Sequence, residues 1–455
     1  MRELRLVPAA LCVWGAAFAV IVVGPWAALG LVAAVMLALL LWREPGQAIF
    51  TGGIGVCSVA LAWWRVAVAQ GFNVHQGITG MISGMPKELD SGSWLLRLQV
   101  DGYPAAVPVF SSALPQGAVP GAMVAATGQV KDPTRPGVGA FVINGDVEVL
   151  RPPEGFAAFA AGVRERFAAA VVEHVGPHAQ GIIPGMVLGD VSFQTGEEQQ
   201  AYIDTGLSHL SAVSGANCMY VATAALILAR LARGGLRAQL AAAGVALVVY
   251  AGLIGPEPSV LRATVSGLVG LVAVISSSRA EPIHALCLSI IGLILVDSDL
   301  AVNYAFALSV AATGSIVALS PLIYQALGRT GWPDIFVRVL SVAIAADMAT
   351  APLIAAMVGR IPVASVVANV LVSPVTGMVT VLGMAAAILA QISHVLAAPV
   401  LWVVGPLGGW VRTVAEAIAR APHATVEVAP ALVVVCYGWI LAGFIVARGR
   451  IRRIE

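Results

Sequence analysis

Two apolar segments in immediate succession decide the fold class of this chain. Residues 7–42 read VPAALCVWGAAFAVIVVGPWAALGLVAAVMLALLLW, without one charged side chain. The Gly24-Pro25 pair divides this run into residues 7–23 and 26–42, each close to the length that crosses a hydrocarbon core about 30 Å thick. A cleaved signal peptide would explain a single segment, but a second segment that follows at once predicts a helical hairpin in a membrane.

The composition of the whole chain agrees with a membrane protein. Of its 455 residues, 59% are hydrophobic and 11% are charged, and the mean hydropathy is +0.91, whereas soluble proteins carry about 25% charged residues. The net charge of +1 excludes the wholesale capture of a polyanion by a strongly basic domain. The five cysteines and seven histidines lack the spacing of a metal site, so we expect no metal and no cofactor.

Further apolar segments predict a polytopic α-helical protein with about a dozen spans. A third segment follows at residues 49–69, and nine more lie in the second half of the chain. The segment 394–420 is the least typical of them, because three charged residues interrupt it, and whether it crosses the membrane or lies along it stays open. The nine expected spans are 206–231, 237–255, 260–276, 282–297, 300–320, 336–358, 362–390, 394–410 and 427–447.

The positions of the arginines predict the orientation of these spans. Arg2 and Arg5 precede the first span and Arg43 follows the second. Because positive charge stays on the cytoplasmic side, these ends are expected in the cytoplasm. With twelve spans the basic C-terminus returns to the same side. The segment after the third span then lies outside.

That outer segment changes to a period of two residues, which is typical of strands rather than helices. Its short runs are separated by Gly, Pro and Asp turns, so it predicts a small β-barrel inserted between the membrane helices. Its basic residues give it a weakly basic face, and they are Lys87, Arg97, Lys131, Arg135 and Arg151. The expected strands are Ile78–Gly84, Ser93–Val100, Ala105–Phe110, Ala122–Val130 and Ala140–Val149.

These patterns divide the chain into four parts. Residues 153–205 are amphipathic, with phenylalanines at helical spacing opposite charged residues, and such segments commonly lie along the membrane interface. The expected parts are a three-span segment at 1–71, the β domain at 72–152, interfacial helices at 153–205 and a transmembrane region of about nine spans at 206–455.

The most unusual stretch is HLSAVSGAN at residues 209–217, which opens a span. Polar groups at membrane depth need partners or water, so the stretch is compatible with a lined cavity. The alternative is that its serines bond to their own helix carbonyls and its glycine permits close helix packing. Both interpretations stay open. The residues concerned are His209, Ser211, Ser214, Gly215 and Asn217.

Four further positions place polar or helix-breaking residues inside spans. Arg262 enters a span soon after Glu257, where it needs a partner or must reach the interface. Asp347 lies midway along another span and is expected to face the interior of the helix bundle. Asn369 and Pro374 interrupt the longest apolar run, which predicts a broken or re-entrant helix there.

Several enzyme classes are excluded by spacing. Ser214 is not part of a G-x-S-x-G elbow, and the chain has neither a phosphate-binding G-x-x-x-x-G-K-[ST] loop nor an H-E-x-x-H zinc motif. We therefore expect no catalysis.

Five motifs resemble those of the ComEC-type competence proteins, which carry DNA across the bacterial cytoplasmic membrane during natural transformation. The most specific is GLSHLSAVSGAN at 206–217. The others are LGD at 188–190, PSVLRA at 258–263, NYAFALS at 303–309 and NVLVSP at 369–374. The chain departs from the family in two respects. Asn217 stands where many members have His, and the chain ends at Glu455 where longer members continue into a metallo-β-lactamase-like domain.

The resemblance implies a channel for single-stranded DNA in the bacterial cytoplasmic membrane, with both termini inside. It implies an extracytoplasmic OB-like barrel, in which the candidate DNA contacts are Lys87, Arg97, Lys131 and Arg135. It also implies an extracytoplasmic DNA receptor, a separate nuclease and a cytoplasmic helicase-like motor as partners, while homo-oligomerisation stays open. The expected path is lined or gated by His209, Ser211, Ser214, Asn217 and Arg262, with Asp347 and Asn369 holding helices in place.

Two other functions remain open from the sequence. The same polar cluster would suit a transporter of small solutes or lipids in the cell envelope. An intramembrane hydrolase that uses Ser214 with His209 is a third class.

Overall fold

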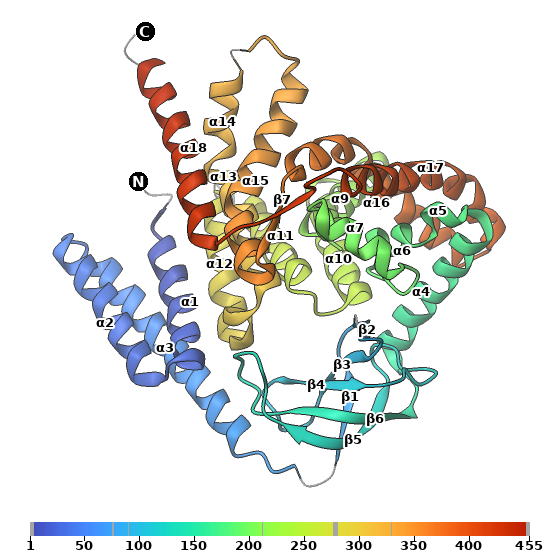
Figure 1. Ribbon diagram of the computed structural model, residues 1–455, viewed down its shortest axis with the longest axis horizontal. Helices are drawn as coiled ribbons and strands as arrows, with labels where there is room; N and C mark the ends of the chain where they lie inside the picture. Colours follow the sequence, from blue (N-terminus) through green and yellow to red (C-terminus); the bar gives the residue numbers. More distant parts are fainter. Residues whose placement is uncertain are drawn as a thin grey trace. The chain divides into compact units, whose positions relative to one another are not determined.

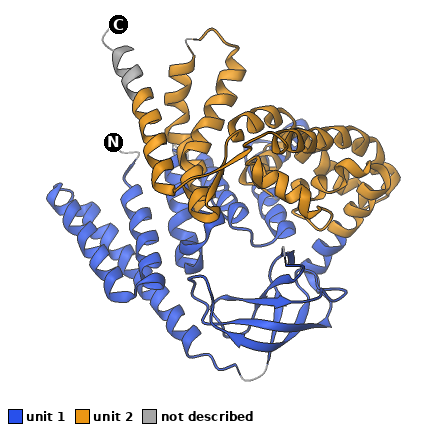
Figure 2. Cartoon of the chain, in the orientation of Figure 1, with its two compact units in different colours: residues 1–163, 225–306 blue, residues 164–224, 307–455 orange. Residues whose placement is uncertain are grey.

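The structure of the chain is a computed structural model, which describes residues 4–74, 77–89, 91–211, 213–275, 281–328 and 330–451. It consists of two compact units, each assembled from two stretches of the chain (Figure 2). The first contains residues 1–163 and 225–306, and the second contains residues 164–224 and 307–455.

The first unit begins with the predicted helical hairpin and a third helix (Figure 1). Gly24 has a φ of 128°, which favours glycine, and Pro25 opens the second helix, so this pair makes the sharp turn. The helices α1 and α3 pack together, and α1 also packs against α12. The helical elements of this unit are α1 (Val7–Val22), α2 (Pro25–Leu41), α3 (Pro45–Gln70), α10 (Leu236–Ile254), α11 (Pro258–Ile275), α12 (Pro282–Val296) and the short 3-10 helix η2 (Ser298–Val302).

The same unit contains the barrel. Five strands close in the order β1-β5-β6-β4-β3 and back to β1, with β4 and β6 parallel and the other pairs antiparallel, which is the arrangement of an OB fold. All five predicted strands are confirmed, and the two-residue β2 was too short to predict. The strands are β1 (Gly77–Ile82), β2 (Lys87–Glu88), β3 (Trp94–Gln99), β4 (Ala106–Ser111), β5 (Met123–Lys131) and β6 (Val142–Arg151).

The apolar core of the barrel extends to the ends of two membrane helices. Alternate residues of the strands point inward, as Leu96, Leu98 and Val107 do, and are almost completely buried. Ala69 of α3 belongs to this core, and Ile21 of α1 packs against it. The barrel is therefore packed against the helices of its unit as well as covalently connected to them.

The second unit is helical apart from one pair of short strands. Helix α4 (Gly155–His174) leads into it, and α9 leaves it. Its two longest membrane helices, α16 and α17, pack against each other and against the short helix α6. The remaining elements are α5 (Pro177–Gln180), α6 (Ile182–Leu188), α7 (Gly196–Asp204), α8 (Ser208–Ser211), α9 (Gly215–Leu231), α13 (Tyr304–Ala318), α14 (Ser320–Leu327), α15 (Asp334–Val358), β7 (Arg360–Pro362), α16 (Ser365–Ala390), α17 (His394–Ala419), β8 (Thr425–Glu427) and α18 (Pro430–Ile451).

The helices confirm a polytopic membrane protein. Among the described residues, seven helices are long and apolar enough to cross a membrane, or eight if the pair α13 and α14, bent by 45°, is one span. Four shorter apolar helices coincide with other expected spans: α1, α2, α12 and the described part of α18. The total of twelve therefore stays a prediction. Helix α17 is continuous over 26 residues despite its charges.

The predicted break at Pro374 is wrong, because α16 continues through it. Proline removes the N–H that would bond to the Val370 carbonyl. The hydroxyls of Ser373 and Thr376 donate to other carbonyls, those of Asn369 at 2.6 Å and Ser373 at 3.0 Å. The helix runs through the proline all the same, as α15 does at Pro352.

Within the segment 153–205, the structure shows one helix that is not at a surface. All seven residues of α6 are buried. The interfacial position of the remaining segment stays a prediction.

Candidate functional site

The signature segment 206–217 begins at a glycine that no other residue would replace without strain. Gly206 ends α7 with a φ of 72°, a left-handed conformation that side chains with a Cβ disfavour. A Cβ added here would lie 2.7 Å from the hydroxyl oxygen of Ser365. The segment therefore turns directly against the first residue of α16.

The segment then forms the short helix α8 and re-enters a helix at α9, where Asn217 makes the central contacts. Its Nδ2 donates to the Met186 carbonyl at 2.8 Å. Its Oδ1 accepts from the hydroxyls of Ser214 and Thr380, each at 3.3 Å. Asn217 is 5% exposed. The side chain therefore ties the start of α9 to α6 and α16.

These hydrogen bonds can be compared with the predicted role of Asn217, which is to line or gate a DNA path. A buried amide whose donor and acceptor are both bonded is held in place, since leaving either group unpaired costs about 1–3 kcal/mol. Tyr220, one turn along α9, packs its ring against Gly377 of α16, where a Cβ would lie 3.3 Å from ring atoms. In this conformation Asn217 joins helices, and its role in lining a path stays a prediction.

The other residues of the signature lie nearby. His209 is exposed, and its Nδ1 lies 3.1 Å from the Gly206 carbonyl. Ser214 immediately precedes α9, and Gly215 is its first residue. The side chain of Ser211 lies outside the described residues.

The remaining predicted residues occupy three separate places. Asn369 is in α16, where its Nδ2 donates to the Ser365 carbonyl at 2.9 Å, one turn away from the contact with Gly206. Pro374 is exposed on the same helix. Asp347 of α15 accepts a hydrogen bond from the Tyr437 hydroxyl of α18 at 2.5 Å, so it joins two helices. Arg262 belongs to the first unit, where it is 6% exposed near the start of α11, which does not fit a side chain extended into the interface.

The LGD motif at 188–190 closes α6 beside the signature segment. Gly189 caps the helix with a left-handed φ of 74°. The Asp190 carboxylate accepts from the backbone N–H of Ser192 at 3.0 Å and from its hydroxyl at 2.6 Å. Burial lowers the pKa of Arg164, and the nearby Asp190 carboxylate opposes that shift. The motif therefore places the buried Asp190 carboxylate near the buried guanidinium of Arg164.

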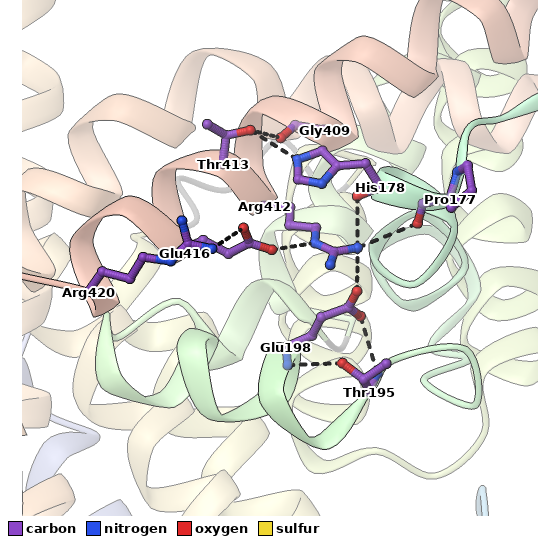
Figure 3. Close-up of polar contacts among 9 residues, drawn as sticks. All are labelled: Pro177, His178, Thr195, Glu198, Gly409, Arg412, Thr413, Glu416 and Arg420. Atoms are coloured by element: carbon purple, nitrogen blue, oxygen red, sulfur yellow. Dashed lines mark hydrogen bonds and ion pairs between the residues drawn. The ribbon is translucent and has the colours of Figure 1, made fainter.

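A polar network that the sequence did not predict joins α17 to the helices before the signature (Figure 3). Its centre is Arg412, which forms ion pairs with Glu198 of α7 and Glu416 of α17, the second at 2.6 Å. The same guanidinium donates to the carbonyls of Pro177 and His178 at 3.4 and 3.3 Å. This network fixes the C-terminal half of α17 to the segment that carries the site.

Glu198 has a second role in this network. Its carboxylate accepts from the backbone N–H of Thr195, whose hydroxyl accepts from the backbone N–H of Glu198, which is a capping box at the start of α7. The T-x-x-E spacing was the signal that sequence reasoning missed. The network borders a cavity of about 400 Å³ lined by Pro177, His178, Gln180, Gly181, Phe193, Thr195, Glu198 and Arg412.

The barrel places two of its candidate DNA contacts on one face. Lys87 is opposite Leu95 across β2 and β3, and Arg97, two residues further along β3, is opposite Pro108 of β4. Both basic side chains are exposed. Phe110 of β4 is half-buried and lies opposite Leu95, so it shares this outer face. The outer face of β3 and β4 therefore combines positive charge with an aromatic ring.

The other barrel candidates lie elsewhere. Lys131 ends β5 and Arg135 lies in the loop between β5 and β6, and both are exposed. Tyr103 and Phe141 are each 6% exposed and pack their rings together, so they belong to the core rather than to a stacking surface. Among the described residues, no group of three His, Cys, Asp or Glu side chains is placed to hold a metal ion.

Comparison with known proteins agrees with the motifs. A family model described as "Competence protein" matches residues 186–450, more than half of the chain. The chain is similar to ComE operon protein 3 of Bacillus subtilis (strain 168), with 26% identity over 226 residues. This alignment covers 49% of the chain but only 28% of the relative's length. No solved structure matches the chain. The matched region contains the signature segment and every helix of the network around Arg412 except α5, and the chain belongs to the competence protein family.

Proposed function

We propose that the protein takes part in DNA uptake during transformation by carrying single-stranded DNA across the bacterial cytoplasmic membrane. Family membership supports a role in uptake. The observation that carries the single-strand assignment is the OB-like barrel whose β3–β4 face joins Arg97 and Lys87 with Phe110. Basic grooves with aromatic rings bind single strands because the cations contact phosphates while the rings stack on bases.

The barrel is proposed to lie outside the cytoplasm and to receive the strand there. The topology expected from the sequence and one contact in the structure both support this placement. The count of spans puts the β domain and the turn between α12 and α13 on the outer side. A hydrogen bond of 2.6 Å between Val138 of the barrel and Asp299 of that turn is consistent with one shared side. Both termini are then cytoplasmic.

A strand that crosses the bilayer carries one charge per phosphate and needs a hydrated path with weak, repeated contacts. We expect that path beside the signature segment, where α6, α9 and α16 meet. Asn217 is buried and hydrogen-bonded here. A DNA strand therefore passes either after these hydrogen bonds break or along a path that does not include Asn217. Among the described side chains of the segment, the exposed His209 and the half-buried Ser214, which donates to Asn217, are the proposed lining residues.

The proposal assigns no catalysis and no cofactor to this chain. A separate nuclease would degrade the second strand, an extracytoplasmic receptor would deliver the duplex, and a cytoplasmic helicase-like motor would draw the strand inward. Homo-oligomerisation is compatible with this scheme. Each of these partners is inferred from a step of DNA uptake that this chain is not proposed to perform.

The intramembrane hydrolase is the less supported alternative. A serine nucleophile needs a base within hydrogen-bonding distance of its hydroxyl. In the described residues the Ser214 hydroxyl donates to Asn217, while the Nδ1 of His209 faces the Gly206 carbonyl. The second alternative is a transporter of small solutes or lipids. A test of single-stranded DNA binding distinguishes it from the proposed function.

The test measures single-stranded DNA binding by the purified protein as a function of salt. Each phosphate contact contributes about 0.7 to the slope of log affinity against log salt. Arg97→Gln is expected to lower that slope by about 0.7, and Phe110→Ala to weaken binding by about 1–3 kcal/mol. Arg151→Gln is the matched control, since it removes one exposed charge at the far end of β6. Equal slopes for the two arginine variants, or no binding by wild type, would refute the proposal.

A further inference from the structure

One loop of the barrel is held by a residue from the membrane helices of the same unit. The backbone N–H of Val138, in the loop between β5 and β6, donates to Asp299 Oδ1 at 2.6 Å. Asp299 belongs to η2, which follows α12, 161 residues further along the chain. A Cβ on Gly137 would lie 3.3 Å from the same oxygen. The contact is therefore a close approach of backbone to carboxylate, which a glycine accommodates.

The same loop is held on its other side by the barrel itself. The backbone N–H of Ala140 donates to the Tyr103 hydroxyl at 2.6 Å. The rings of Tyr103 and Phe141 lie 5.1 Å apart, and Phe72, which leads from α3 into the barrel, packs against both. Two anchors thus act on this loop. Asp299 connects it to η2.

The charged groups around Asp299 are few. Asp297 lies two residues before it, accepts the Asp299 backbone N–H at 3.1 Å and pairs with Arg65 of α3 at 3.7 Å. The helices packed against η2 are α1, α3 and α12. Helix α1 carries no charged residue, and His284 of α12 lies at the opposite end of that helix. On the barrel side, the pKa of Tyr103 is raised by burial and, to a smaller extent, by the Asp299 carboxylate.

We propose that Asp299 is a positioning residue that anchors the β5–β6 loop, and with it Arg135, so that the barrel presents single-stranded DNA to the membrane helices in one orientation. This inference rests on the proposed function. Besides the apolar packing of Val138 in the barrel core, the loop has this polar contact with one carboxylate of η2. The loop should therefore loosen when that carboxylate is removed, while the barrel core stays folded.

The anchor is also expected to depend on pH. Burial raises the pKa of Asp299 to about 6 from a usual value of 3.8, although the bond from Val138 opposes the shift. The Val138 N–H bonds more strongly to an ionised than to a neutral carboxyl, which is why this bond lowers the pKa. Protonation is therefore expected to weaken the anchor as the pH falls through about 6.

The experiment is amide hydrogen exchange of the loop peptide 132–141 in the full-length protein, corrected for the intrinsic pH dependence of exchange. Wild type should show less protection at pH 5 than at pH 7, because protonation weakens the bond from Val138. Asp299→Asn keeps an acceptor oxygen but does not titrate, so the loop should stay protected without a pH step. Asp299→Leu should lose protection at both pH values. Asp101→Asn, an exposed aspartate of the barrel, is the control and should match wild type.

The outcomes separate the anchor from the DNA role. Wild-type protection in Asp299→Leu would overturn the anchor whatever the protein binds. If the loop loosens in Asp299→Leu while crosslinking of bound single-stranded DNA to the membrane helices is unchanged, the positioning role is overturned. If wild type binds no single-stranded DNA, the proposed function fails, and the presentation of DNA fails with it. Loosening together with lost crosslinking, at unchanged protection of the barrel core, supports the inference.

Discussion

Substitution of Asn217 tests whether the signature segment holds helices together or lines the path of the DNA. Asn217→Ala removes the donor to the Met186 carbonyl and the acceptor for Thr380. Thr380 keeps a bond to the Thr376 carbonyl at 3.0 Å, so its hydroxyl remains satisfied. The main consequence is that the Met186 carbonyl loses its side-chain donor within a buried helix.

The expected loss of stability follows from these contacts. An unpaired buried carbonyl costs about 1–3 kcal/mol, and the lost side-chain packing adds about 1 kcal/mol. Asn217→Ala should therefore lower the free energy of unfolding by about 2–4 kcal/mol. Ser373→Ala is the control, because that hydroxyl is exposed and bonds only to its own helix, and it should stay within about 0.5 kcal/mol of wild type.

The assay is denaturant unfolding of the purified protein in mixed micelles, combined with DNA uptake at matched protein level. Combining Asn217→Ala with Thr380→Val should reveal a coupling energy of about 0.5–1.5 kcal/mol, since the two side chains share a bond. If Asn217→Ala keeps wild-type stability and abolishes uptake, the residue lines the path and the structural interpretation is refuted.

Two further predictions concern neighbouring contacts. Gly206→Ala should cost about 2–4 kcal/mol, because left-handed strain is about 1–2 kcal/mol and the new Cβ meets Ser365. Gly196→Ala, where the added Cβ meets no atom, should be nearly neutral in the same unfolding assay, and equal effects would contradict the close approach. A double-mutant cycle of Asp347→Leu and Tyr437→Phe should give a coupling of about 1.5–3 kcal/mol, as for a hydrogen bond to a charged group. A coupling near zero would show that this pair does not join α15 to α18.

The features that followed from the sequence are those with a local pattern. The apolar runs gave the membrane class, and the alternation around Leu96 and Leu98 gave the strands, because each pattern is a direct result of which face a residue buries. The expected break at Pro374 failed because one missing N–H does not end a helix that is also held by packing, as α16 is against α17.

The site was less predictable, because its contacts join distant parts of the chain. Asn217 could be recognised as a polar residue in a span, but Thr380, which bonds to it, lies 163 residues away. Arg412 is one of the three charged residues that interrupt the apolar segment 394–420, and its ion pairs with Glu198 and Glu416 show why a charge is tolerated there. Asp299 carried no signal at all, since its contact is with a backbone N–H. Side-chain type alone does not encode such pairings.

The most direct test of DNA transport is to delete the gene, supply labelled duplex DNA and measure label that becomes nuclease-protected inside the cells. The account predicts protected single-stranded label in wild type, background levels in the deletion strain and recovery when the gene is restored. Equal protected label with and without the gene, or none in wild type, would contradict it.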